Sequence, residues 1–155
     1  MCGDLFDASF LEPASPVYTA PPTPAPELSA IRTLDELRGH VSAMTVCAIF
    51  HVFKTEELQL TLARALASLL SPEPGSMIMG RHSGLPEKGV YESPVFPMFC
   101  HSPESWEEMW DGVVFEKGTV KVETRLVEKQ RKMMMPDGVL GQKPMFILEW
   151  AVTRV

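Results

Sequence analysis

The sequence has too few basic residues for a nucleic-acid-binding surface. Lysine and arginine number 14 against 20 aspartate and glutamate residues, so the 155-residue chain carries a formal net charge of -6. A nucleic-acid surface needs clustered basic side chains. The short cluster of Lys129, Arg131 and Lys132 reads as a solvated loop. We therefore expect no nucleic-acid partner.

Cysteines and long apolar runs are also scarce. The three cysteines, Cys2, Cys47 and Cys100, are widely spaced and odd in number, which predicts neither a disulfide framework nor a metal site. This favours a reducing, cytoplasmic compartment. No apolar run reaches the roughly 18 residues that a membrane helix needs. The N-terminus shows no basic segment followed by an apolar one, so no secretory signal and no membrane association are expected.

What the sequence does contain predicts a globular domain with one extended segment. The hydrophobic fraction of 45% is sufficient for a core, and a chain of 155 residues favours one domain. Six of the 14 prolines lie within residues 12–30, which predicts an extended, solvated loop. A short helix is expected at residues 33–38, capped by Thr33 and ended by Gly39.

Residues 41–83 have the pattern of a strand, a helix and a second strand. The apolar run 41–50 predicts a strand covered on both faces. Thr55 can cap the helix, and residues 76–80 predict the next strand. The helix has one apolar stripe at helical spacing, formed by Leu58, Leu62, Ala65, Leu66, Leu69 and Leu70. This is the crossover unit of a parallel sheet, and it predicts an α/β fold.

The second half of the chain predicts a loop, a helix and two strands. Residues 85–101 contain three prolines and are expected to form a long loop. Ser102 can cap a helix in which Trp106, Met109, Trp110 and Val113 share one face. Residues 119–127 and 145–154 alternate between apolar and polar side chains, as half-exposed strands do. With no helix between them, these two strands should pair antiparallel.

Several phrases then resemble a known family. FHVF, LLSPEPGSMIMGRH, CHSPESWEEMW and EWAVTR resemble the second half of a class I S-adenosylmethionine-dependent methyltransferase with a Rossmann-like sheet. They look closest to fungal enzymes that methylate secondary metabolites, some of which esterify carboxylates in meroterpenoid pathways. The resemblance implies O-methylation of a small metabolite, with S-adenosylmethionine as the cofactor.

The sequence departs from this family at its N-terminus. The family begins with a strand and a Gly-rich loop that holds the cofactor, and no such unit is present here. In the family's sheet order, 3-2-1-4-5-7-6, residues 1–6 would supply strand 3 and strands 1 and 2 would be missing. We therefore expect a partial domain with impaired activity, whose strand 4 (residues 41–48) forms an open edge.

The resemblance also implies a set of cofactor-binding residues. Asp4 would accept a hydrogen bond from the adenine amino group and Leu5 would pack on the ring, the alternative being a frayed terminus. Thr45, Val46 and Cys47 lie at the end of strand 4, where the family lines its pocket. The alternative for Val46 and Cys47 is ordinary core.

Three further residues are candidates for contacting the substrate, because ligands bind beyond the carboxyl ends of parallel strands. His51 is the candidate catalytic residue, which would orient the acceptor or take its proton, and a structural histidine is the alternative. Arg81 and His82 are expected to follow the second strand and bind an acidic substrate, the alternative being a solvated loop.

Two other functions fit parts of the pattern. A non-catalytic module or pseudoenzyme that associates through the open strand edge, as a homodimer, would explain the absent Gly-rich loop. Half of a nicotinamide-dependent dehydrogenase would fit the parallel strands but not the terminal antiparallel pair.

Overall fold

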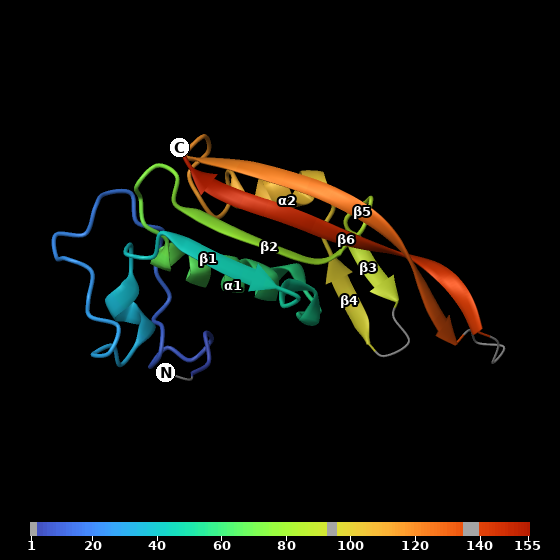
Figure 1. Ribbon diagram of the computed structural model, residues 1–155, viewed down its shortest axis with the longest axis horizontal. Coiled ribbons are helices and arrows are strands. Elements are labelled where there is room, and N and C mark those ends of the chain that lie inside the picture. The colour runs from blue at the N-terminus through green and yellow to red at the C-terminus, as the bar shows by residue number, and fades with distance from the viewer. Residues whose placement is uncertain (1–2, 93–95, 135–139) are drawn as a thin grey trace.

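The computed structural model describes residues 3–92, 96–134 and 140–155. Four strands form a mixed sheet in the order β1-β2-β6-β5 (Figure 1). The strands are β1 (Ala43–Cys47), β2 (Met77–Gly84), β6 (Leu140–Arg154) and β5 (Val120–Met134). β1 runs parallel to β2, whereas β6 is antiparallel to both β2 and β5. The predicted α/β class, the parallel crossover and the terminal antiparallel pair are confirmed.

Two α-helices pack on one face of this sheet. They are α1 (Glu56–Leu69) and α2 (Pro103–Trp110). Their buried side chains meet alternate residues of the strands in one core, which contains Leu62, Leu66, Ile78, Trp106, Trp110, Leu148, Trp150 and Val152. The opposite face, which we call the bare face, carries the exposed side chains of Ala43, Thr45, Cys47, Met79 and Arg81. No helix in the described ranges is both long and apolar enough to cross a membrane.

The helix α1 begins where the sequence predicts. The Thr55 hydroxyl accepts the Leu58 N–H at 3.4 Å. The predicted burial of Leu58 is wrong, because its side chain is 44% exposed. Gln59 takes the inward position instead, and its amide donates to the carbonyls of Phe53 (3.1 Å) and Phe99 (2.8 Å). These bonds satisfy the amide N–H groups, while the buried Oε1 of Gln59 has no hydrogen-bond partner among the described residues.

The N-terminal strand predicted for residues 1–6 is not found in the described part. Residues 3–11 form turns, in which the Asp4 carboxylate accepts the Phe6 N–H at 2.9 Å. A short polar side chain that bonds its own backbone in this way competes with an extended conformation. The predicted strand is therefore corrected to a turn for residues 3–6.

Strand lengths also differ from the prediction. β1 is shorter and is exposed at alternate residues, because only one face of the sheet is covered. β2 continues to Gly84, so Arg81 and His82 lie inside it. Part of the predicted loop 85–101 is a hairpin of β3 (Gly89–Glu92) and β4 (Pro97–Cys100). Lys129, Arg131 and Lys132 belong to β5 rather than to a loop.

The proline-rich residues 12–30 contain neither helix nor strand, and they contact the end of the sheet. Arg154 at the end of β6 donates to the Val17 carbonyl at 2.6 Å. Its guanidinium lies 4.8 Å from the centre of the Tyr18 ring. The Tyr18 hydroxyl accepts the Glu116 N–H at 2.8 Å. After this segment the chain forms the 3-10 helix η1 (Leu34–Leu37).

Candidate functional site

The carboxyl end of β1 turns sharply into a 3-10 helix, η2 (Phe50–Val52). Ala48 adopts a φ of 57°, in the left-handed region that is uncommon for residues other than glycine. Its N–H still bonds the Arg81 carbonyl at 2.8 Å, so the turn is attached to β2. The turn buries Phe50 completely and leaves the next residue, His51, half-buried beside the end of β2.

His51 is held as a neutral ring. Its Nδ1 accepts a long hydrogen bond of 3.5 Å from the Ser83 N–H, which places the ring proton on Nε2. Burial lowers the pKa of His51 below its usual value. The ring can therefore donate one hydrogen bond through Nε2. This arrangement suits the orienting role predicted for His51 better than proton abstraction.

His82 lies in the core rather than beyond the end of a strand. Its Nδ1 accepts the Trp150 Nε1–H at 3.0 Å, and its ring centre is 4.5 Å from that of Trp106. Burial, followed by the proximity of His101 and His51, lowers the pKa of His82 to about 3. The expected position after the strand is wrong for both Arg81 and His82, because β2 ends at Gly84, four residues beyond the end of the predicted segment 76–80. Successive strand residues point to opposite faces, so Arg81 lies on the bare face.

His101, the third histidine of this region, was not predicted from the sequence as a site residue. It follows β4, is fully buried, and its Nδ1 lies 3.0 Å from the Ser105 hydroxyl. Burial lowers the pKa of His101 to about 4. Its position directly before the capping residue Ser102 is the feature of the sequence that could have indicated it. Among the described residues, no three His, Cys, Asp or Glu side chains are grouped as metal ligands.

The structure divides the other predicted residues between the two faces of the sheet. Thr45, Cys47 and Arg81 share the bare face, and Cys47 is directly opposite Arg81 in the ladder. Val46 packs against the core on the other face. Cys47 and Arg81 are thus brought together at the carboxyl end of β1, beside the middle of β2.

The N-terminal turn lies near the carboxyl end of β1. The Phe6 ring is 5.2 Å from that of Phe53, which follows η2. Leu5 packs against the core. The Asp4 carboxylate is exposed and already accepts the Phe6 N–H.

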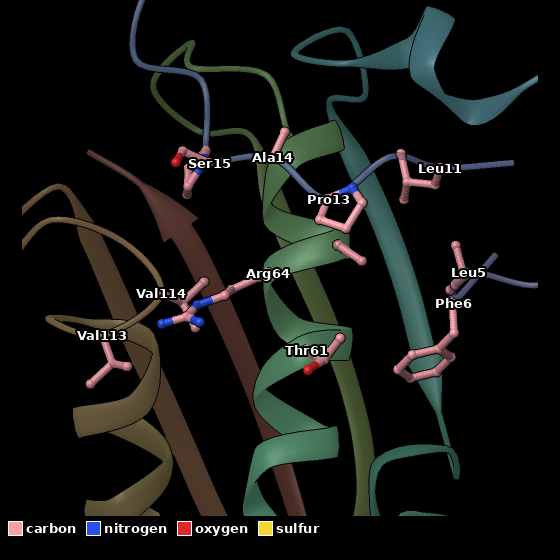
Figure 2. Close-up of a pocket in the computed structure, with 12 residues that line it drawn as sticks. Leu5, Phe6, Leu11, Pro13, Ala14, Ser15, Thr61, Arg64, Val113 and Val114 are labelled. Atoms are coloured by element: carbon pink, nitrogen blue, oxygen red, sulfur yellow. The ribbon is translucent and has the colours of Figure 1, made fainter. Parts of the chain in front are cut away.

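A pocket of about 590 Å³ opens between this N-terminal segment, α1 and the turn after α2 (Figure 2). Leu5 lines it together with Leu11, Pro13, Thr61, Arg64, Val113 and Val114, among others. Of the residues predicted to bind the cofactor, Leu5 alone reaches this pocket. His51 and Arg81 do not line it either.

The described residues do not fit S-adenosylmethionine as a complete site. A cofactor pocket would need the predicted binding residues around one cavity. Leu5 and Val46 instead face the core side, Thr45 and Cys47 face the bare side, and the Asp4 carboxylate is engaged in its own turn.

Comparison with known proteins supplies the family resemblance. No family model matches the chain. It is 31% identical over 88 residues to O-methyltransferase phiE of a fungal species, covering 56% of this chain and 29% of that protein. It is 28% identical over 126 residues to methyltransferase ausD of Penicillium brasilianum, covering 78% of the chain and 42% of that protein. Over 145 residues it is 26% identical to methyltransferase trt5 of Aspergillus terreus, covering 85% of the chain and 49% of that protein.

The chain spans less than half the length of each of these relatives. The matches nevertheless confirm the resemblance indicated by its motifs. The chain is similar to fungal methyltransferases over most of its length.

Proposed function

We propose that this chain takes part in S-adenosylmethionine-dependent O-methylation of a small secondary metabolite. The similarity to named methyltransferases carries the proposal, and one of these relatives is named an O-methyltransferase. In this proposal β1, β2, β6 and β5 correspond to strands 4, 5, 7 and 6 of the class I methyltransferase sheet. In such sheets ligands bind beyond the carboxyl ends of the parallel strands, where His51 follows β1.

Two residues would act on the acceptor. The neutral His51 ring has its Nε2–H available to orient an acceptor oxygen. The Arg81 guanidinium, with its paired donors, suits an acceptor carboxylate. Methylation of a carboxylate needs alignment and exclusion of water rather than a base. A histidine whose pKa is lowered by burial is compatible with that reaction.

The experiment is a search for methylated products by mass spectrometry. The chain is incubated with a panel of small carboxylic acids and phenols at millimolar S-adenosylmethionine, because weak cofactor binding is expected. We expect slow methyl ester formation that Arg81→Gln reduces about tenfold. Lys117→Gln, which removes an exposed positive charge from the turn before β5, is the control and should have no effect. No product above the level without protein would contradict the catalytic proposal.

A second candidate function, association of two copies, rests on the outer edge of β1. The Ser42 carbonyl accepts the Met77 N–H at 2.9 Å, and the Ala48 N–H donates to the Arg81 carbonyl at 2.8 Å. Each strand of a parallel ladder bonds its neighbour through alternate residues. The backbone groups of Ala43, Thr45 and Cys47 therefore point to the open edge, where no backbone partner is found among the described residues.

This edge suits a second copy of the same chain. The strand β1 carries no charged residue, and nothing repels an identical strand placed antiparallel about Thr45. In that arrangement the two Arg81 residues would lie about 19 Å apart from strand spacing and rise. This exceeds the screening length of about 10 Å. We therefore propose a homodimer joined through β1.

Hydrogen exchange measured at two protein concentrations tests the dimer. The amides of Ala43 and Thr45 should exchange fast in dilute solution and slowly in concentrated solution. The amides of Met44 and Val46, which face β2, should be protected at both concentrations. Protection of all four amides at both concentrations would contradict the open edge.

A further inference from the structure

The pocket of Figure 2 has the size of a small-molecule site, although no predicted substrate-contacting residue lines it. Its volume of about 590 Å³ lies within the range of roughly 300–1,000 Å³ that is usual for ligand pockets. The walls come from three separate parts of the chain: residues 5–16, α1 and Val113–Val114. A ligand there would contact all three.

The single charged residue of the lining is Arg64, on α1. Figure 2 shows its side chain extending from the helix toward Val114. No described residue forms a hydrogen bond or ion pair with its guanidinium. The sequence explains this, because the positions three and four residues away are Leu60, Thr61, Ala67 and Ser68, none of which is acidic. Arg64 therefore has its donors available at the pocket.

The free hydrogen-bond donors of the lining come mainly from Arg64. The Thr61 hydroxyl already donates to the Glu57 carbonyl at 2.8 Å. The Ser15 hydroxyl also lines the pocket. No aspartate or glutamate lies among the twelve lining residues. A ligand that supplies acceptors and negative charge is the chemical complement of this set.

The remaining walls are apolar, and two of their side chains are unusually open to solvent. Phe6 is 42% exposed and Val113 is 52% exposed, whereas Leu11 and Val114 are buried. An apolar ligand body would remove the first two side chains from water while resting on the other two. Burial of that surface is favourable in proportion to its area.

We propose that this pocket binds a small monocarboxylate with an apolar body. The carboxylate would pair with the Arg64 guanidinium, whose two parallel N–H donors match its oxygens. The body would lie against Leu5, Leu11 and Val114. The site is independent of the proposed methyl transfer, because His51 and Arg81 are not part of its lining.

Titration with decanoate, followed by calorimetry and by backbone amide chemical shifts, tests the proposal. Amides of residues 5–16, 61–65 and 113–114 should shift, and Arg64→Gln should weaken binding about tenfold or more. Decanamide, a neutral ligand of matched length, should bind the unmodified chain about as weakly as decanoate binds R64Q. Arg64→Lys should recover part of the affinity. Arg125→Gln is the control for general loss of positive charge, and it should leave the affinity unchanged.

Three results would overturn the proposal. The first is equal affinity for decanoate and decanamide, since the charge would then have no role. The second is unchanged decanoate binding by R64Q. The third is a set of shifts confined to other parts of the chain. The thermal unfolding of R64Q, compared with that of the unmodified chain, confirms that the variant is folded.

Discussion

Trp150 donates its indole N–H to Nδ1 of His82 across 3.0 Å inside the core, and these two residues lie on neighbouring strands. Gly80 provides the space for this contact, since it is opposite Trp150 in the ladder. A Cβ atom on Gly80 would lie 3.0 Å from Trp150 Cζ2 and 1.8 Å from the Val46 carbonyl oxygen. The close approach of β1, β2 and the indole therefore requires a glycine at this position.

A double-mutant cycle should show that His82 and Trp150 are coupled. His82→Phe leaves the indole N–H without a partner, and the loss should be about 1–3 kcal/mol. Trp150→Phe removes the indole N–H donor and also leaves unfilled space in the core. The double variant should be less destabilised than the sum of the two by about 1 kcal/mol, measured by urea unfolding. Additive losses would mean that the bond contributes nothing to stability.

Stability should fall with acid because His82 and His101 are buried as neutral rings. Their pKa values are lowered to about 3 and about 4 in the folded state, against an ordinary value of 6.5. The unfolded chain therefore binds more protons below pH 6.5. The stabilisation is complete above that pH and is lost as the pH falls toward the folded-state values, by up to about 1.4 kcal/mol per pH unit for each ring.

Urea unfolding from neutral pH to about pH 5 measures this dependence. In His82→Gln one ring is removed, while His101 and His51, whose pKa values burial also lowers, remain. The slope of the unfolding free energy against pH should therefore fall by about a third to a half. The same slope in H82Q and in the unmodified chain would show that His82 does not titrate on unfolding.

Two leucines of α1 form a matched pair for testing the helix orientation. Leu66 is buried in the core, and Leu66→Ala should cost about 2–5 kcal/mol of unfolding free energy. Leu58 lies on the exposed side, and Leu58→Ala should change it by less than about 0.5 kcal/mol. Similar losses in the two variants would mean that the helix is rotated from the described orientation.

Thr45→Pro should abolish dimer formation while leaving the sheet intact. The Thr45 N–H points to the open edge, so proline removes a donor that β2 does not use. Ala43→Lys should weaken association by placing a charge on the same edge. Light scattering at tens of micromolar measures the mass. Thr45→Val, which keeps the N–H, and Met79→Lys, which changes the bare face away from the edge, are the controls and should remain dimeric.

Two results would refute the model of association through the edge. One is a monomer for the unmodified chain under the same conditions. The other is a dimer that Thr45→Pro leaves unchanged, since the contact would then lie elsewhere.

The features predicted from the sequence are those determined by local chemistry. Thr55 and Ser102 cap α1 and α2 because their hydroxyls reach backbone N–H groups within the same turn. The terminal strands follow from alternation in residues 119–127 and 145–154. The hairpin β3–β4 was missed because its prolines indicate a loop, yet Pro97 occupies the first position of a strand, where no N–H is required.

The placement of the site residues depends on tertiary contacts that no local pattern encodes. His82 looks like a polar loop residue until Trp150, 68 positions later in the chain, supplies its hydrogen-bond donor. Thr45 and Cys47 lie on the bare face and Val46 lies on the core face, because the helices cover only one face of the sheet. Arg64 was not predicted as a ligand-binding residue, because its pocket is completed by the proline-rich segment.

The length of the β5–β6 hairpin has a further consequence. β2 pairs with β6 only from Phe146 to Thr153, whereas β5 follows β6 along its full length (Figure 1). Beyond Glu128 and Phe146 the hairpin is a ribbon of two strands, and such ribbons are marginally stable alone. Its exposed basic residues Lys129, Arg131 and Lys132 are trypsin cleavage points. Limited digestion should therefore nick the chain first at the ribbon and leave the tryptophan-rich core folded.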